Sequence, residues 1–137
     1  MSFCTAVNCI DGRVQLPVIR YLQEQFGVLY VDLVTEPGPA RSLAGSVDAE
    51  IKRSILRRVA MSINAHGSEL IAVVAHADCA RNPAGREAKE LQLAESAAVL
   101  AESFPSVSIV GLWVDERWSV SPTCRLGPAG EGGGQDT

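Results

Sequence analysis

Apolar residues gather in four short runs, separated by segments in which they recur every three or four positions. The runs cover residues 5–9, 28–34, 70–75 and 107–114, and they are nearly continuous, as expected of strands covered on both faces. The intervening segments predict helices over 16–26, 47–66 and 86–104. This alternation predicts an α/β fold with a mostly parallel sheet of four to five strands flanked by helices.

Local signals refine the ends of these elements. Pro17 suits the first turn of its helix, and Gly27 suits the position after the last turn. Ser46 is expected to cap the second helix, and Pro37-Gly38-Pro39 predicts a turn. A short fifth strand or an edge hairpin is expected at 117–120. The second helix has an apolar stripe with four-residue spacing: Val47, Ile51, Ile55, Val59 and Ile63.

Length and composition indicate one domain over residues 1–126, followed by a glycine-rich polar tail, 127–137, that is expected to be disordered. The net charge of −4 argues against nucleic-acid binding, which needs a clustered basic face. No apolar run is long enough to span a bilayer, and nothing at the N-terminus marks export. We therefore expect a cytoplasmic protein without membrane or nucleic-acid partners, in a compartment where thiols stay reduced.

Two motifs follow predicted strands. Cys9, Asp11 and Arg13 come after the first strand, and His76 and Cys79 come after the third. In parallel sheets, ligands bind outside the carboxyl ends of the strands, so the two motifs are expected to meet at one edge. Two thiolates and one imidazole suit Zn²⁺, and three protein ligands leave a fourth position for water, as in catalytic sites. The sequence thus predicts a zinc lyase or hydrolase.

Asp11 has two possible roles. It could be the fourth zinc ligand and close the site, or it could pair with Arg13 and leave that position to water. In the second arrangement the ionised Asp11 accepts a hydrogen bond from a metal-bound hydroxide and orients it. Zinc lowers the pKa of bound water to about 7, which supplies the nucleophile. We expect a small substrate without a charged handle, since no glycine-rich phosphate loop and no second basic motif is found.

Other candidate residues have simpler interpretations. Asp78 is either an acceptor behind the ligands or a turn cap, and His66 is a favourable charge at a helix C-terminus. Trp118 is expected in the core or an interface. The two remaining cysteines, Cys4 and Cys124, are expected to be structural or incidental.

The combined motifs resemble those of the β-class carbonic anhydrases, which carry Cys-x-Asp-x-Arg after the first core strand and His-x-x-Cys after a later one. The resemblance covers residues 5–114. It implies a lyase, a carbonate dehydratase, that hydrates CO2 to bicarbonate. It also implies that Cys9, His76 and Cys79 hold zinc, that an Asp11–Arg13 dyad gates the metal, and that the chain assembles as a homodimer or a higher oligomer.

The chain departs from the family pattern in several places. Gly12 stands where serine is usual, Ala80 stands where glycine is usual, and residues 35–39 replace a segment containing Arg-Asn. A helical arm that normally locks the dimer and brings a glutamine to the partner's site is expected to be missing, and Gln15 is a candidate substitute. Three alternatives stay open: a COS or CS2 hydrolase, a non-catalytic zinc-binding protein with a closed site, and a redox dithiol. The last ranks lowest because no Cys-x-x-Cys is present.

Overall fold

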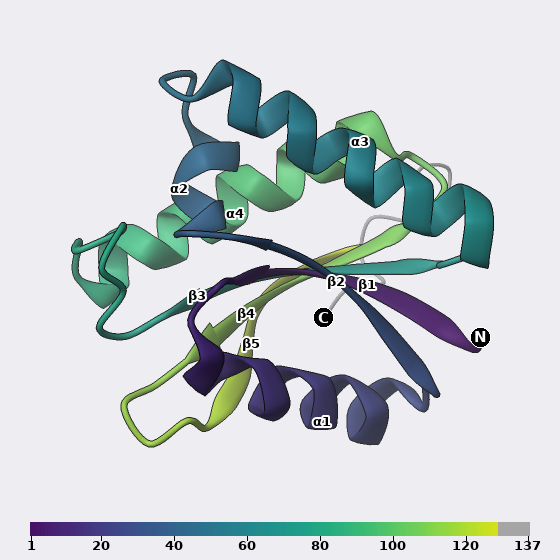
Figure 1. Ribbon diagram of the computed structural model, residues 1–137, viewed down its shortest axis with the longest axis horizontal. Helices are drawn as coiled ribbons and strands as arrows, with labels where there is room; N and C mark the ends of the chain where they lie inside the picture. Colours follow the sequence, from purple (N-terminus) through teal and green to yellow (C-terminus); the bar gives the residue numbers. More distant parts are fainter. Residues whose placement is uncertain (129–137) are drawn as a thin grey trace.

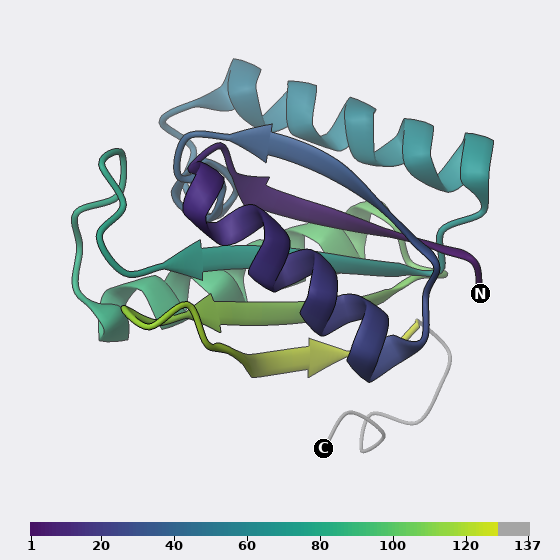
Figure 2. The ribbon, with the colours of Figure 1, turned by 60° about the horizontal axis from the view of Figure 1, so that its bottom comes forward.

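The computed structural model describes residues 1–128 and contains a five-stranded sheet with the order β2-β1-β3-β4-β5. The first four strands in the chain run parallel, and the last runs antiparallel to its neighbour (Figure 2). The predicted mostly parallel α/β fold is therefore confirmed. The strands are β1 Phe3–Cys9, β2 Tyr30–Glu36, β3 Leu70–His76, β4 Ser108–Val114 and β5 Val120–Leu126.

Helices cover both faces of the sheet. One face is covered by α1 (Gln15–Phe26), which follows a single 3₁₀ turn at Gly12–Val14. The other face is covered by α2 (Pro39–Ala44), α3 (Ala49–His66) and α4 (Arg86–Ser103) (Figure 1). This three-layer arrangement leaves the carboxyl ends of β1 to β4 open at one edge.

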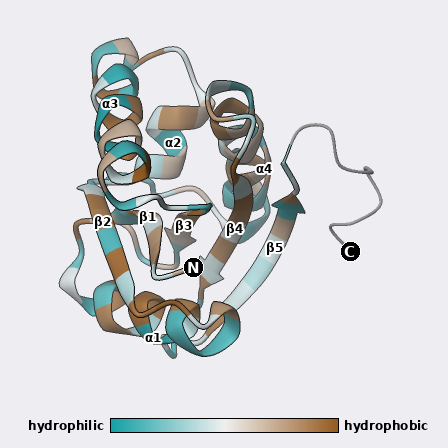
Figure 3. Ribbon diagram, turned by 90° about the vertical axis from the view of Figure 1, so that its right-hand side faces the viewer, coloured by the Kyte–Doolittle hydropathy of each residue, from teal (hydrophilic) through white to brown (hydrophobic). Residues whose placement is uncertain are grey.

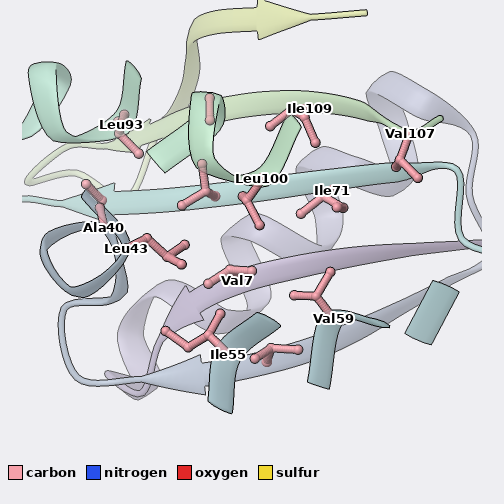
Figure 4. Packing of buried hydrophobic residues seen from close by; sticks show 14 of the residues in the cluster. Val7, Ala40, Leu43, Ile55, Val59, Ile71, Leu93, Leu100, Val107 and Ile109 are labelled. Carbon is pink, nitrogen blue, oxygen red and sulfur yellow. The ribbon is translucent and has the colours of Figure 1, made fainter. Parts of the chain in front are cut away.

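Each face of the sheet has its own apolar core. Under α2, α3 and α4 the core includes Val7, Leu43, Ile55, Leu93 and Leu100 (Figure 4). Every residue of β3 is buried, whereas β5 at the edge of the sheet is only half-buried. The residues of β5 are also less hydrophobic than those of β4 (Figure 3). Burying a leucine or isoleucine side chain contributes roughly 1.5–3 kcal/mol, so the buried side chains on both faces of β3 contribute to the stability of the sheet.

Several element boundaries differ from the prediction. The second strand begins at Tyr30 rather than residue 28, and α3 begins at Ala49, with Asp48 rather than Ser46 at the N-cap position. Val47, assigned to the buried stripe, is 88% exposed because it precedes the helix. The helix α2 was not predicted, because its six residues are too few to show a period.

The fifth strand lies later in the chain than expected. Residues 117–119 belong to a turn, in which the Asp115 carboxylate accepts hydrogen bonds from the backbone N–H groups of Arg117 and Ser119. Cys124 consequently lies within β5. Most of the predicted tail, 127–137, lies outside the described residues. Over residues 1–128, no helix is both long and apolar enough to cross a membrane.

Candidate metal centre

The side chains of Cys9, His76 and Cys79 come together at the open edge of the sheet. Their ligand atoms all lie within 4.8 Å of one another, and the two sulfurs are 3.9 Å apart. All three residues are buried. They meet because β1 pairs directly with β3, so that residues 70 positions apart in the chain leave the sheet side by side.

The imidazole of His76 is oriented by the backbone of the next residue, Ala77. Its Nδ1 donates to the carbonyl oxygen of Ala77 at 2.6 Å, which leaves Nε2 as the atom facing the two sulfurs. Nε2 is buried and has no hydrogen-bond partner among the described residues. A buried unpaired nitrogen costs about 1–3 kcal/mol, and a bound metal ion removes that cost. Fixing one ring nitrogen so that the other can bind metal is usual in metal sites.

The sulfurs of Cys9 and Cys79 lie in hydrogen-bond contact, and this contact shifts the pKa values of the two thiols in opposite directions. The hydrogen bond with Cys79 lowers the pKa of Cys9, with further contributions from His76 and from the backbone of Gly38 and Asp11. The same contact, together with burial, raises the pKa of Cys79. For His76, burial acts to lower the pKa, but the neighbouring Cys9 and the Ala77 carbonyl raise it. A cation between these groups would stabilise both thiolates.

The space between the ligands is small. A cavity of about 10 Å³ adjoins the three side chains, which is roughly the space needed for one water molecule or one ion. The backbone N–H of Asn82 donates to the carbonyl oxygen of Cys79 at 3.2 Å, which closes the turn that presents Cys79. The donor set, the unpaired imidazole nitrogen and the size of the cavity all fit a single metal ion. The cavity is lined by Cys9, Gly38, Pro39, Ala40, Val74, Ala75, His76, Cys79 and Asn82.

Asp11 pairs with Arg13 and is not one of the three clustered groups. The Asp11 carboxylate accepts hydrogen bonds from Nε of Arg13 at 3.0 Å and from Nη2 at 2.7 Å, which is a bidentate pair. It also accepts from the backbone N–H of Arg13 at 2.9 Å. These bonds lower the pKa of Asp11 to about 2. The structure thus contains an Asp11–Arg13 ion pair, and the role of this pair beside a metal stays a prediction.

Arg13 is held by two further groups. Its Nη1 lies 3.3 Å from the Asp78 carboxylate, so Asp78 is an acceptor for the guanidinium. The guanidinium carbon lies 4.9 Å from the centre of the Trp118 ring. Trp118 has a φ of 64°, which is rare for a bulky residue. Trp118 was not expected at this site from the sequence, although the loop that follows the fourth strand lies at the same edge of the sheet.

The remaining candidates lie elsewhere or have backbone roles. Gln15 donates to the carbonyl oxygen of Cys9 at 2.9 Å, so its amide nitrogen is engaged by the backbone. His66 pairs with Asp32 at 2.7 Å. Burial raises the pKa of Cys4 to about 12, with a smaller effect of Asp32, which makes this thiol unreactive at neutral pH. Cys124 packs against the core.

Gly38 provides a first testable prediction. Its φ of 58° is left-handed, and an added Cβ would lie 3.3 Å from Arg81 O and from Asn82 Cβ. Gly38→Ala should therefore destabilise the protein by about 1–2 kcal/mol in urea unfolding. Gly45→Ala is the control, because its φ is −95° and its Cβ would make ordinary contacts. Equal effects of the two substitutions would show that backbone strain at Gly38 is unimportant.

Sequence comparison identifies the family. A profile of the family described as "Putative carbonic anhydrase" matches residues 1–124. The chain belongs to this carbonic anhydrase family. No curated protein sequence matches significantly.

Solved structures show that this carbonic anhydrase family member has the β-carbonic anhydrase fold. It is similar to isoform I β-carbonic anhydrase of Trichomonas vaginalis, with 16% identity, 88% of this chain and 81% of that chain covered, and a TM-score of 0.58. It is also similar to a tetrameric β-carbonic anhydrase of Sordaria macrospora, with 10% identity, 88% of this chain and 80% of that chain covered, and a TM-score of 0.58. A carbon disulfide hydrolase also matches, with 14% identity, 86% of this chain and 76% of that chain covered, and a TM-score of 0.50. At these identities the structures establish the fold alone.

Proposed function

We propose that the protein is a zinc-dependent carbonic anhydrase that hydrates CO2 to bicarbonate. The observation that supports this most is the buried group of Cys9, His76 and Cys79 beside an Asp11–Arg13 pair that leaves the group uncapped. Two thiolates and one imidazole are a ligand set of catalytic zinc sites. Zinc held there would lower the pKa of a water molecule to about 7 and so supply a nucleophile at neutral pH.

The protein's own groups have distinct roles in this proposal. Cys9, His76 and Cys79 bind the metal, and Nδ1 of His76 stays bonded to the Ala77 carbonyl. Asp11 is kept ionised by Arg13, so it can only accept hydrogen bonds. It accepts one from the attacking water and directs the oxygen lone pair toward the substrate carbon. Arg13 keeps the carboxylate of Asp11 from turning toward the metal.

Stopped-flow CO2 hydration by the zinc-loaded protein tests the activity. We expect a rate well above that of a Cys9→Ser protein prepared in the same way. Equal rates for the two proteins would reject the proposal. Rapid zinc binding with no hydration at any pH would instead favour a non-catalytic zinc-binding protein.

Hydrolysis of COS or CS2 is a second candidate, because one structural match is named a carbon disulfide hydrolase. The same nucleophile would attack a similar linear molecule. Release of hydrogen sulfide from COS, compared with CO2 hydration on the same preparation, distinguishes the two activities. A larger kcat/KM for COS would make hydrolysis the principal reaction.

We also propose that the protein acts in the cytoplasm as a homodimer or a higher oligomer. One of the structural matches is described as tetrameric, which supports assembly. Light scattering after size-exclusion chromatography measures the mass directly. A mass equal to one chain of 14.5 kDa would contradict the proposed assembly.

Trp118 should influence the rate through Arg13. Trp118→Ala removes the ring beneath the guanidinium, and we expect CO2 hydration to fall about two- to fivefold. Trp118→Phe keeps an aromatic face and should retain most of the rate. If both variants lose activity equally, the strained backbone of the turn, rather than the aromatic ring, accounts for the effect of Trp118 on the hydration rate.

A further inference from the structure

Lys89, on α4, is almost completely buried although lysine seldom is. Only 2% of the residue is exposed, and lysines are rarely fully buried unless they are paired. Its Nζ donates to the carbonyl oxygen of His76 at 2.8 Å. No acidic partner lies within salt-bridge distance of Lys89 in the part of the chain that the structure describes. The desolvated lysine therefore makes its recorded hydrogen bond with the backbone of a candidate metal ligand.

With that hydrogen bond, both polar groups of one peptide unit have a partner. The peptide between His76 and Ala77 accepts from Lys89 through its carbonyl, and its N–H donates to the carbonyl of Val114 at 3.0 Å. The plane of this peptide is therefore held from both sides, by α4 and by β4. The next carbonyl, that of Ala77, accepts from Nδ1 of His76 and so sets the direction of Nε2.

The surroundings keep this contact away from water. Nζ of Lys89 lies 5.9 Å from the centre of the Trp113 ring, and Trp113 is only 4% exposed. An aromatic face attracts a cation and offers no competing lone pair. The turn that follows is strained, since Asp78 has a φ of 57°. The same turn presents Cys79, so the peptide after His76 has to be held in place where the turn begins.

We infer that Lys89 is a positioning residue: it holds the carbonyl oxygen of His76 and thereby fixes the imidazole in the direction that binds metal. The inference rests on the metal site of the proposed function. Lys89 does not touch the metal or the substrate. Its effect passes through the peptide after His76 and the Ala77 carbonyl.

Lys89→Met tests the inference because it removes the N–H donors and nearly keeps the volume. We expect the dissociation constant for zinc, measured by chelator competition, to rise about 10- to 100-fold, as for other groups that orient metal ligands. In the metal-free protein, the Ala77 amide should exchange with solvent about tenfold faster, whereas the Val73 amide keeps its protection. Thermal stability without metal should be unchanged or higher, because a thioether is cheaper to bury than an ammonium group.

Controls separate positioning from general damage. Lys52→Met makes the same change at the only other lysine and should leave zinc affinity and Ala77 exchange unaltered. Lys89→Arg keeps N–H donors and should restore most of the affinity. If Lys89→Met does not fold, Lys89→Gln replaces it in the test, because the amide nitrogen of glutamine is one bond closer to the backbone than the ammonium nitrogen of lysine. Zinc affinity within twofold of wild type, or an Ala77 amide as protected as before, would overturn the inference.

The two proposals can fail separately. If the wild-type protein binds no zinc, the proposed function is rejected, yet the exchange of the Ala77 amide in the metal-free chain still decides whether Lys89 holds this peptide. If zinc binding and CO2 hydration are normal in both Lys89→Met and wild type, only the role of Lys89 is rejected.

Discussion

Cys79→Ser is expected to abolish stoichiometric zinc and to reduce CO2 hydration to the uncatalysed rate. The substitution removes one of three buried groups that lie within 4.8 Å of one another, and a serine hydroxyl is a poor replacement for a thiolate ligand. Since the metal contributes several kcal/mol to catalysis, we expect a loss of roughly a thousandfold or more. Elemental analysis of the freshly purified protein and stopped-flow hydration measure the two effects.

Cys124→Ser is the matched control, because it makes the same chemical change in β5, outside the ligand group. We expect zinc content and hydration to stay near wild type in this variant, with at most a modest loss of stability from the core. Retention of one zinc per chain by the Cys79→Ser protein would contradict the assignment of Cys79 as a ligand.

Arg13→Ala has the second largest expected effect, a decrease in hydration of about 100-fold. Without the guanidinium, the Asp11 carboxylate loses the bidentate partner that holds it, and it becomes free to occupy the fourth position on the metal. A misplaced catalytic group can cost about this much. Arg86→Ala is the control, since Arg86 also pairs with a carboxylate, on the surface of α4. Unchanged hydration in Arg13→Ala would remove the pair from the mechanism.

The same variant should change the titration of Asp11. In the wild-type protein the hydrogen bonds from Arg13 lower the pKa of Asp11 to about 2 from an ordinary value of 3.8. Any stabilisation from this pair is fully present above about pH 4 and is lost as the pH falls through about 2. In the metal-free Arg13→Ala protein, where Asp11 has no metal to bind, the pKa of Asp11 should rise toward its ordinary value. Carbonyl ¹³C chemical shifts across an acid titration measure it, and an unmoved value would show that Arg13 is not the cause.

The sequence was sufficient for the parts of the fold that repeat a simple period. Strands buried on both faces and amphipathic helices produce strong local patterns, and β1, β3 and α4 were recognised within one or two residues. The meeting of the Cys9 and His76 motifs was predictable because parallel strands place their carboxyl ends at one edge. The role of these residues as metal ligands remains a proposal.

The missed features depend on short or distant contacts. The helix α2 follows Pro37 and Gly38 and is too short to show a pattern. The strand β5 contains Pro122, which favours a loop in the sequence but is tolerated at the edge of a sheet. The contacts of Lys89 and Trp118 with the site join segments far apart in the chain, and no local pattern encodes them.

The 3.9 Å separation of the sulfurs of Cys9 and Cys79 has a consequence for handling the protein. A disulfide requires the sulfurs to approach to about 2.05 Å, so a small local shift would suffice if dissolved oxygen or peroxide took up the two electrons. A chelated preparation left in air would then lose its capacity to be reloaded. A zinc ion bound as proposed would block that oxidation, so the ion expected to support turnover would also keep its own ligands reduced.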